Sequence, residues 1–231
     1  MTDKESKELR KQVAQCCRML EACGLIDFSG HVSSRFGDNR FLINPRDLSR
    51  FTAAADELVE ARLDGSPVEK GGGVPSEVYI HSSIYQVRPD VTAIAHLHSP
   101  AVITLSIARR PIFPAIINGT LFADGIPIYE DSRIVNTAER GKGLARALGN
   151  ARVIVIRGHG SVVVADSVKA LFMFCVYFER NAQRLFEAYQ IGSPEPLPPD
   201  EIQDQKEWLL RGRVYPKIWD YYASKLEKPG R

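Results

Sequence analysis

The residues with the clearest chemical potential are the five histidines, at positions 31, 81, 96, 98 and 159. His96 and His98 stand two apart in a segment, Val91 to His98, that has strand character. Because side chains alternate between the two faces of a strand, both imidazoles point the same way and can offer nitrogens to one cation. His159 stands between two glycines, which let the backbone turn and a ligand approach closely. Three neutral imidazoles with one open coordination position are typical of a catalytic divalent-metal site.

Each of these histidines also has a plainer explanation. A pair spaced like His96 and His98 can simply lie on the polar face of a strand, and a histidine between glycines can be a turn residue. Their joint occurrence near the ends of predicted strands favours a metal site, but spacing alone leaves both explanations open.

Glu77 and His81 are four residues apart at the start of a predicted helix, which Ser76 can cap and which runs to about Tyr85. A carboxylate at that place commonly only stabilises the helix dipole. If it reaches the metal pocket instead, it can act as a general acid and base. His81 could orient a ligand, but a packed core histidine is the expectation.

Hydrophobic periodicity and turn residues predict alternating helices and strands. Helices are expected over residues 4–23, 76–85, 100–107, 136–149 with Asn136 as cap, and 166–190 with Asp166 as cap. Strands are expected over 28–36, 40–45, 58–63, 91–98 and 152–156, with short extended pieces over 112–128. This mixture predicts one three-layer α/β or α+β domain.

The composition excludes several classes of partner. The net charge is +2 and the basic residues are dispersed, so neither nucleic acid nor an anionic membrane surface is expected. No apolar stretch is long enough to cross a membrane, and the N-terminus lacks the apolar core of a secretory signal. The four cysteines lack the spacing of a zinc site and are expected to be free thiols, which fits a cytoplasmic location.

The end of the chain differs from the rest. A stiff proline-rich bridge, Pro194 to Pro199, leads into a segment rich in tryptophan and tyrosine. We therefore divide the chain into a domain over residues 1–192 and an extension over 193–231, which is expected to pack on that domain or on a neighbouring subunit.

Four segments together resemble the class II aldolase/adducin family in their order and spacing. They are Gly30-His-Val-Ser33, Pro75-Ser-Glu77 with His81, His96-Leu-His98-Ser-Pro100 and Gly158-His-Gly160. The resemblance covers roughly residues 8 to 190 and implies an α/β/α fold with a central, mostly antiparallel sheet. It also implies a homotetramer with active sites at subunit interfaces. By the same resemblance His96, His98 and His159 hold one divalent metal ion, and Glu77 is the acid/base.

Three segments differ from the sugar-phosphate aldolases of that family. Gly30-His-Val-Ser33 replaces Gly-Asn-x-Ser, Asn44-Pro-Arg-Asp47 replaces Thr-Pro-x-Gly, and Pro75-Ser76 replaces a pair of serines. These changes remove donors suited to phosphate, whereas His31 and Arg46 add groups suited to a carboxylate. Arg46 could equally be a surface arginine in a turn. The predicted substrate-binding residues are Gly30, His31, Ser33, Asn44, Arg46 and Ser76.

The resemblance is nearest to members that decarboxylate hydroxylated aromatic or heteroaromatic acids. The prediction is a lyase using Zn²⁺, Mn²⁺ or Co²⁺ on a small carboxylate substrate, in which aromatic rings of the extension could cover a flat ligand. One alternative is an aldolase that cleaves a ketose, a ketose phosphate or a hydroxyketo acid. The other is a non-catalytic, adducin-like scaffold. An epimerase is disfavoured because the family's epimerases lack the glutamate seen here as Glu77.

Overall fold

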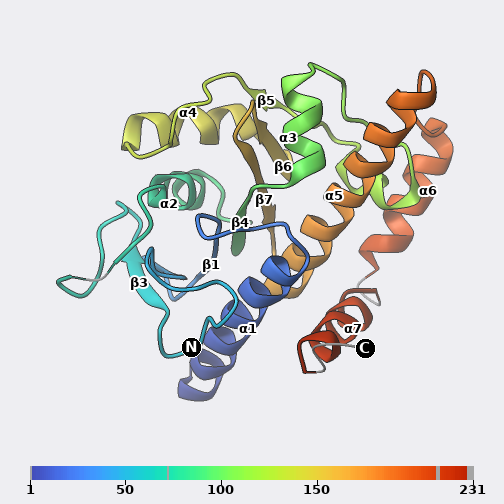
Figure 1. The fold of residues 1–231 in the computed structure, drawn as a ribbon. Coiled ribbons are helices and arrows are strands. Elements are labelled where there is room, and N and C mark those ends of the chain that lie inside the picture. Colours follow the sequence, from blue (N-terminus) through green and yellow to red (C-terminus); the bar gives the residue numbers. More distant parts are fainter. Residues whose placement is uncertain (1, 72, 212–213, 228–231) are drawn as a thin grey trace.

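A seven-stranded sheet organises the computed structural model, which describes residues 2–71, 73–211 and 214–227 (Figure 1). Its strands are β1 His31–Arg35, β2 Arg40–Ile43, β3 Val59–Arg62, β4 Ala93–Leu97, β5 Ile128–Tyr129, β6 Val153–Ile156 and β7 Gly160–Ala165. They lie in the order β3-β2-β1-β4-β7-β6-β5, and every neighbouring pair is antiparallel except β5 and β6. The prediction of a mostly antiparallel central sheet is confirmed.

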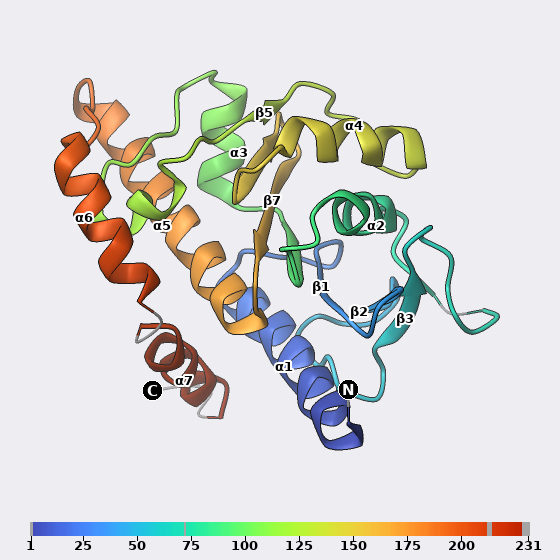
Figure 2. The ribbon, with the colours of Figure 1, turned by 180° about the vertical axis from the view of Figure 1, so that it is seen from behind.

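Helices cover both faces of this sheet. They are α1 Asp3–Ala22, α2 Val78–Val87, α3 Pro100–Ile107, α4 Ala138–Leu148, α5 Val168–Ile191, α6 Pro199–Leu210 and α7 Val214–Glu227, with a 3₁₀ turn, η1, over Ile117–Phe122. The helices α1, α3 and α5 share one core with the sheet, and α2 and α4 share the other; Figures 1 and 2 show the arrangement from opposite sides. The predicted three-layer α/β/α fold is confirmed.

Alternation along β4 produces these two cores. Ala93, Ala95 and Leu97 point into the core of α1 and α5, whereas Ile94 points into the core of α2 and α4. The alanines leave room for α5, whose first half is buried on nearly every side, as its apolar sequence predicted. His96 shares the face of Ile94, so the site lies on the α2 side of the sheet.

Two local predictions were wrong. No strand was predicted after His159, yet Gly160–Ala165 forms β7, the strand between β4 and β6. The stretch 112–128, predicted as extended pieces, contains η1 and only the first residue of β5. Its backbone is tied to α5, because the buried Asn181 side chain accepts a hydrogen bond from the N–H of Ala115 (3.0 Å) and donates one to the carbonyl of Phe113 (2.8 Å). A contact between residues so far apart in the chain leaves no local signal.

Three helix caps were also placed one residue too early. Glu77, not Ser76, is the N-cap residue of α2, although its side chain makes no capping bond. Thr137, not Asn136, caps α4, and Ser167, not Asp166, caps α5. Both hydroxyls accept a backbone N–H three residues further on, as N-caps do. A run of two polar residues offers two candidate caps, and the packing of the following helix decides between them.

The extension packs on the preceding domain through α6, which lies against η1, and α7, which lies against α5 and α1 (Figure 1). Leu209 and Trp219 are buried in the core of the preceding domain, and the Trp219 ring meets Phe172 of α5 edge-on with centroids 6.0 Å apart. The division of the chain at residue 192 stays a prediction, since both parts share one core. Residues 212–213 and 228–231 lie outside the described residues.

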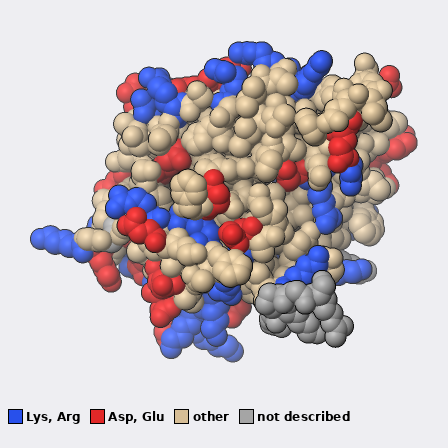
Figure 3. All heavy atoms as spheres, in the orientation of Figure 1, with Lys and Arg blue, Asp and Glu red and all other residues tan. Residues whose placement is uncertain are grey.

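The surface carries both signs of charge, and Figure 3 shows lysine and arginine interspersed with aspartate and glutamate on one face. Among the described residues, each helix is too short or too polar to cross a lipid bilayer.

Replacing Trp219 with alanine is expected to lower the free energy of unfolding by about 3 to 5 kcal/mol, because it empties a buried aromatic site. The matched control is Trp208→Ala on α6, whose side chain is 55% exposed and whose loss is expected to cost about 1 kcal/mol or less. Urea unfolding followed by circular dichroism measures both. Equal effects of the two changes would contradict the described packing of α7.

Candidate metal centre

The candidate metal ligands come from two chain segments joined by strand pairing. His96 lies in β4 and His98 directly follows it, whereas His159 lies in the turn between β6 and β7. Pairing of β4 with β7 places this turn beside the end of β4. Gly160 permits the close approach, because a Cβ there would stand 2.1 Å from the carbonyl oxygen of Leu97.

The three rings converge on one point. Ring centroids are separated by 4.9 Å for His96 and His98, 5.0 Å for His96 and His159, and 5.6 Å for His98 and His159. One nitrogen from each ring lies within 4.8 Å of the others, and the Nε2 atoms of His96 and His98 are 3.2 Å apart. Two nitrogens bound tetrahedrally to one zinc ion stand roughly 3.3 Å apart, so the spacing suits a shared ion.

Hydrogen bonds on the far side of two rings determine which nitrogens carry protons. Nδ1–H of His96 donates to the carbonyl oxygen of Ser161 (3.1 Å), an atom that can only accept. Nδ1–H of His98 donates to the carboxylate of Asp27 (2.9 Å). In the neutral rings both Nε2 atoms therefore present lone pairs, and these face each other with no proton to bridge them. The residues fit a divalent cation, which removes this repulsion.

Glu77 completes the cluster. Its Oε2 lies 3.5 Å from Nε2 of His96 and 3.7 Å from Nε2 of His159, and its Oε1 accepts the N–H of Val135 (3.0 Å). Burial by itself raises the pKa of Glu77, whereas donation from His159 and His96, in states where these rings carry a proton on Nε2, lowers that pKa below the usual carboxyl range. The helix α2 begins at Val78, so Glu77 occupies its N-cap position. Its side chain makes no capping bond and turns into the cluster instead.

A cavity of about 380 Å³ opens beside this cluster. Its wall includes Glu77, His98 and His159, together with three of the predicted substrate-binding residues, His31, Arg46 and Ser76. The aromatic residues of the extension do not line it. The Arg46 side chain is 63% exposed and pairs with Asp47 at 3.2 Å, so it stands at the mouth of the cavity.

The other three predicted substrate-binding residues do not line the cavity; they support its walls. Asn44 is fully buried, and its side-chain oxygen accepts the N–H of Val32 (2.7 Å). Gly30 lies against Ile26, where a Cβ would stand 2.5 Å from the isoleucine Cβ. Ser33 is buried under α2. Gly30, Ser33 and Asn44 are therefore not lining residues of this cavity, and their contact with substrate stays a prediction.

His31 and His81 lie side by side behind the cavity. Nδ1 of His31 is 3.0 Å from Nε2 of His81, and Nδ1 of His81 is 2.6 Å from the Ser33 hydroxyl. Burial, helped by the positive charge that His96 can carry, lowers the pKa of His81 to about 3. Burial also lowers the pKa of His31. His81 is thus a buried and satisfied histidine, as expected, but it joins a polar row and not an apolar core.

Two residues near the site were missed in the sequence. Asp27 orients His98, and its only local signal is a position three residues before Gly30. Arg50 is buried, lines the cavity and donates from Nε to the carbonyl of Gly30 (2.9 Å) and from Nη1 to backbone carbonyls of residues 45, 46 and 48. Among the described residues, no carboxylate forms a salt bridge with Arg50.

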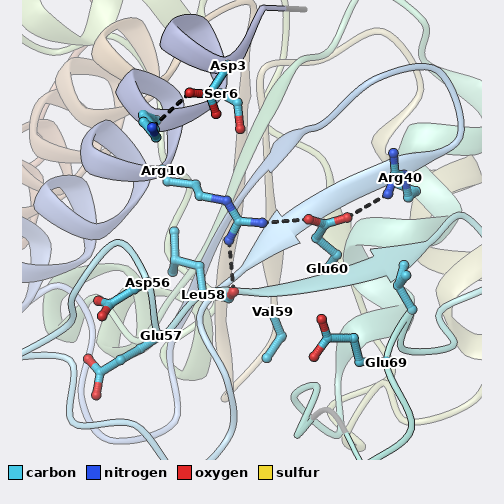
Figure 4. A pocket seen from close by; sticks show the side chains of 12 residues that line it. Asp3, Ser6, Arg10, Arg40, Asp56, Glu57, Leu58, Val59, Glu60 and Glu69 are labelled. Carbon is cyan, nitrogen blue, oxygen red and sulfur yellow. Dashed lines mark hydrogen bonds and ion pairs between the residues drawn. The ribbon is translucent and has the colours of Figure 1, made fainter.

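A larger hollow lies between α1 and β3 and carries different chemistry (Figure 4). Glu60 stands between Arg10 (2.5 Å) and Arg40 (2.8 Å), so its charge is already compensated. The residues that line this hollow include no histidine or cysteine. This hollow shows no counterpart of the imidazole cluster.

Comparison with known proteins agrees with this fold. Residues 11–186 match the family model described as the class II aldolase and adducin N-terminal domain. The chain is 36% identical over 176 residues to a 3,4-dihydroxyphthalate decarboxylase of Arthrobacter keyseri, which covers 69% of this chain and 70% of that protein. It is also 29% identical to human beta-adducin over 177 residues, which are 73% of this chain and 24% of that protein.

Solved structures show the same fold. An aldolase II superfamily protein from Pseudomonas syringae superposes with a TM-score of 0.86 at 24% identity, covering 99% of this chain and 96% of that one. An L-fuculose 1-phosphate aldolase from Glaciozyma antarctica superposes with a TM-score of 0.84 at 20% identity, covering 96% and 90%. The chain belongs to the class II aldolase and adducin family.

Changing Asp27 to asparagine is expected to weaken binding of Zn²⁺ or Mn²⁺ by about 10- to 100-fold, because the charged acceptor that orients the His98 ring is lost. The asparagine oxygen can still accept the N–H of Ser29, which Asp27 binds at 2.7 Å, so the turn is kept. Titration calorimetry against a competing chelator measures the affinity. The exposed Asp38→Asn is the control, and an equal loss in both variants would show that Asp27 does not act through His98.

Proposed function

We propose that this chain is a divalent-metal-dependent carbon–carbon lyase that decarboxylates a small aromatic acid with a hydroxyl group beside the carboxylate. The observation that carries the proposal is the pair of facing Nε2 lone pairs on His96 and His98, with the Glu77 carboxylate at the wall of the same cavity. The similarity to 3,4-dihydroxyphthalate decarboxylases supports this choice of substrate class.

In this proposal His96, His98 and His159 hold the cation, which when bound supplies a Lewis acid that takes up negative charge from the breaking bond. Glu77 accepts the proton of the substrate hydroxyl and returns it to the ring carbon that loses carbon dioxide. The carboxylate leaves as carbon dioxide, its bonding electrons stay on the ring carbon, and the proton held by Glu77 takes its place. The product oxygen that gave up this proton takes another from water. The net reaction needs neither an oxidant nor a reductant.

Two arginines can attract an anionic substrate to the cavity. Arg46 at the mouth is shared with Asp47, whereas Arg50 lies in the wall with a guanidinium that no described carboxylate neutralises. We assign Arg46 to the capture of the incoming anion. We assign Arg50 to a carboxylate that remains on the product, because a planar guanidinium matches a carboxylate well. His31 and Ser76 complete the polar wall.

A specific observation favours each alternative function. The structural similarity to L-fuculose 1-phosphate aldolases supports an aldolase as the first alternative. The similarity to adducins supports a non-catalytic scaffold as the second. The scaffold is disfavoured by the retained imidazole cluster and Glu77, which have no evident use without a reaction. The choice among Zn²⁺, Mn²⁺ and Co²⁺, the homotetramer with sites between subunits and the cytoplasmic location stay predictions.

The discriminating assay incubates the purified protein with each of these metal ions and, in separate reactions, with 3,4-dihydroxyphthalate, a hydroxybenzoate or a ketose phosphate. Carbon dioxide and aldehyde are detected in parallel. Release of carbon dioxide without aldehyde is the expected result. Aldehyde from a ketose phosphate would replace the proposal by the aldolase, and metal binding without either product would favour the scaffold.

Changing Glu77 to glutamine is expected to lower kcat by about 10² to 10⁴, because the group that transfers the proton is lost while its shape is kept. Metal affinity is expected to fall much less, since the three imidazoles remain. Steady-state kinetics and metal titration measure the two quantities. The exposed Glu69→Gln is the control. Full turnover by the Glu77 variant would remove Glu77 from the mechanism.

Changing Arg46 to glutamine is expected to raise KM about tenfold with little change in kcat, because an exposed charge at the mouth binds substrate and transition state alike. The effect should shrink as salt is added, since salt screens exposed charges. The control is Arg62→Gln, which removes an exposed arginine on β3 away from the cavity. Equal effects of the two changes would mean that Arg46 acts only through net charge.

A further inference from the structure

Four buried polar side chains form a continuous row from the cavity into the space between β1 and α2. Nδ1 of His31 lies 3.0 Å from Nε2 of His81, Nδ1 of His81 lies 2.6 Å from Oγ of Ser33, and Oγ of Ser33 lies 2.8 Å from the Tyr85 hydroxyl. None of the four side chains is more than 2% exposed. Each junction needs one proton between its two atoms, so the direction of donation at one end sets the direction throughout.

The direction is set at the Tyr85 end. Among the described residues the Tyr85 hydroxyl has one competing acceptor, the carbonyl of Thr92, at 3.4 Å. That distance exceeds the roughly 2.5 to 3.0 Å of ordinary O–H···O hydrogen bonds, whereas Ser33 lies within this range. That carbonyl already accepts the N–H of Arg35 (2.8 Å) and the hydroxyl of Ser34 (3.1 Å), which use both of its lone pairs. Tyr85 therefore donates to Ser33 at 2.8 Å. Burial raises the pKa of Tyr85, so its hydroxyl keeps the proton it donates.

The remaining protons follow from this first one. The Ser33 hydroxyl accepts from Tyr85, so its own proton goes to Nδ1 of His81. The proton of the neutral His81 ring then stands on Nε2 and is donated to Nδ1 of His31. His31, receiving a proton at Nδ1, carries its own on Nε2. Among the described residues Nε2 of His31 has no hydrogen-bond partner, and it is not among the buried unpartnered atoms. Because His31 lines the cavity, this nitrogen is available to a ligand there.

We propose that Tyr85 and Ser33 are positioning residues that, through His81, hold His31 as the Nε2–H tautomer, so that it donates a hydrogen bond to an anionic oxygen of the substrate. This deepens the proposed function, because it assigns His31 to an oxyanion or carboxylate of the hydroxy acid.

The tautomer matters because of where His31 lies. It is paired with His96 across β1 and β4, and the two ring centroids are 5.1 Å apart. A lone pair on Nε2 of His31 would be a further nitrogen ligand beside the cluster and could occupy the position that the substrate needs. The N–H form repels a cation and attracts an anion. Neighbouring rings are thereby held in opposite tautomers, with His96 protonated on Nδ1 and His31 on Nε2.

The decisive measurement is the tautomer itself, read from two-bond ¹H–¹⁵N correlations of the imidazoles in the full-length protein labelled with ¹⁵N-histidine. The five histidines give few signals, and single histidine variants assign them. His31 and His81 are expected as Nε2–H forms, with His96 and His98 as Nδ1–H forms in both metal-free and Zn²⁺-loaded protein. An Nδ1–H form of His31 overturns the proposal even if the enzyme is active.

Variants then test whether this row of hydrogen bonds sets the tautomer of His31. Tyr85→Phe removes the first donor, so the His81 and His31 signals should move towards a mixture of tautomers. KM for 3,4-dihydroxyphthalate should rise about tenfold, as expected for one lost hydrogen bond to a charged group. Zn²⁺ affinity should not change. Tyr79→Phe, on the same helix but without a hydrogen bond in this row, is the matched control.

Ser33→Ala and Ser33→Thr separate positioning from packing. Alanine breaks the row and should behave like the Tyr85 variant, whereas threonine keeps the hydroxyl and should restore the Nε2–H tautomer and the KM. If threonine restores folding but not the tautomer, the row does not act as proposed. Protein that shows the expected tautomers but releases no carbon dioxide would instead refute the proposed function and leave the row intact.

Discussion

The structure depends on a repulsion that only a cation can remove. Two imidazole nitrogens, each forced to present a lone pair, face one another at 3.2 Å, and a carboxylate oxygen stands within 4 Å of one of them. The protons that would relieve the contact are held on the opposite side of the rings by the Ser161 carbonyl and Asp27. A buried cluster with only acceptors at its centre is costly unless a positive ion shares it.

The fold supplies the rigidity that keeps this arrangement in place. His96 belongs to a central strand that is buried on both faces, and His159 lies in the tight turn that joins β6 to β7. Glu77 comes from the other layer, at the start of α2, where its backbone begins a helix while its side chain turns away from the cap. Strand, turn and helix therefore each contribute, and a local shift in one would misplace only one group.

The histidines divide into two sets with opposite tasks. Two of the cluster, His96 and His98, are oriented by acceptors on Nδ1 and expose lone pairs on Nε2, whereas His31 receives a donor on Nδ1 and exposes a proton. The same side chain can thus serve a cation and an anion a few ångströms apart, because hydrogen bonds on the hidden nitrogen choose the tautomer. Arg50, tied by its Nε and Nη1 groups to backbone carbonyls, adds fixed positive charge to the anionic side of the cavity.

Much of this could be predicted from the sequence, because alternation, turn residues and helix periodicity are local. The two histidines on one strand, the glycines around His159 and the apolar first half of α5 each carry a pattern that needs no partner to be read. The layered fold and the group of candidate ligands followed from these patterns and from the family resemblance.

Other features depended on contacts between residues distant in the chain. Only tertiary contacts decided which nitrogens carry protons: the register of β4 with β7 for His96, Asp27 for His98, and the packing of α2 on β1 for His31. The same contacts showed that Ser33 and Asn44 face inward, and that Arg50 is buried in the cavity wall while Arg46 stands exposed at its mouth. A residue type states which bonds a side chain can form, but only tertiary structure states which partner is within reach.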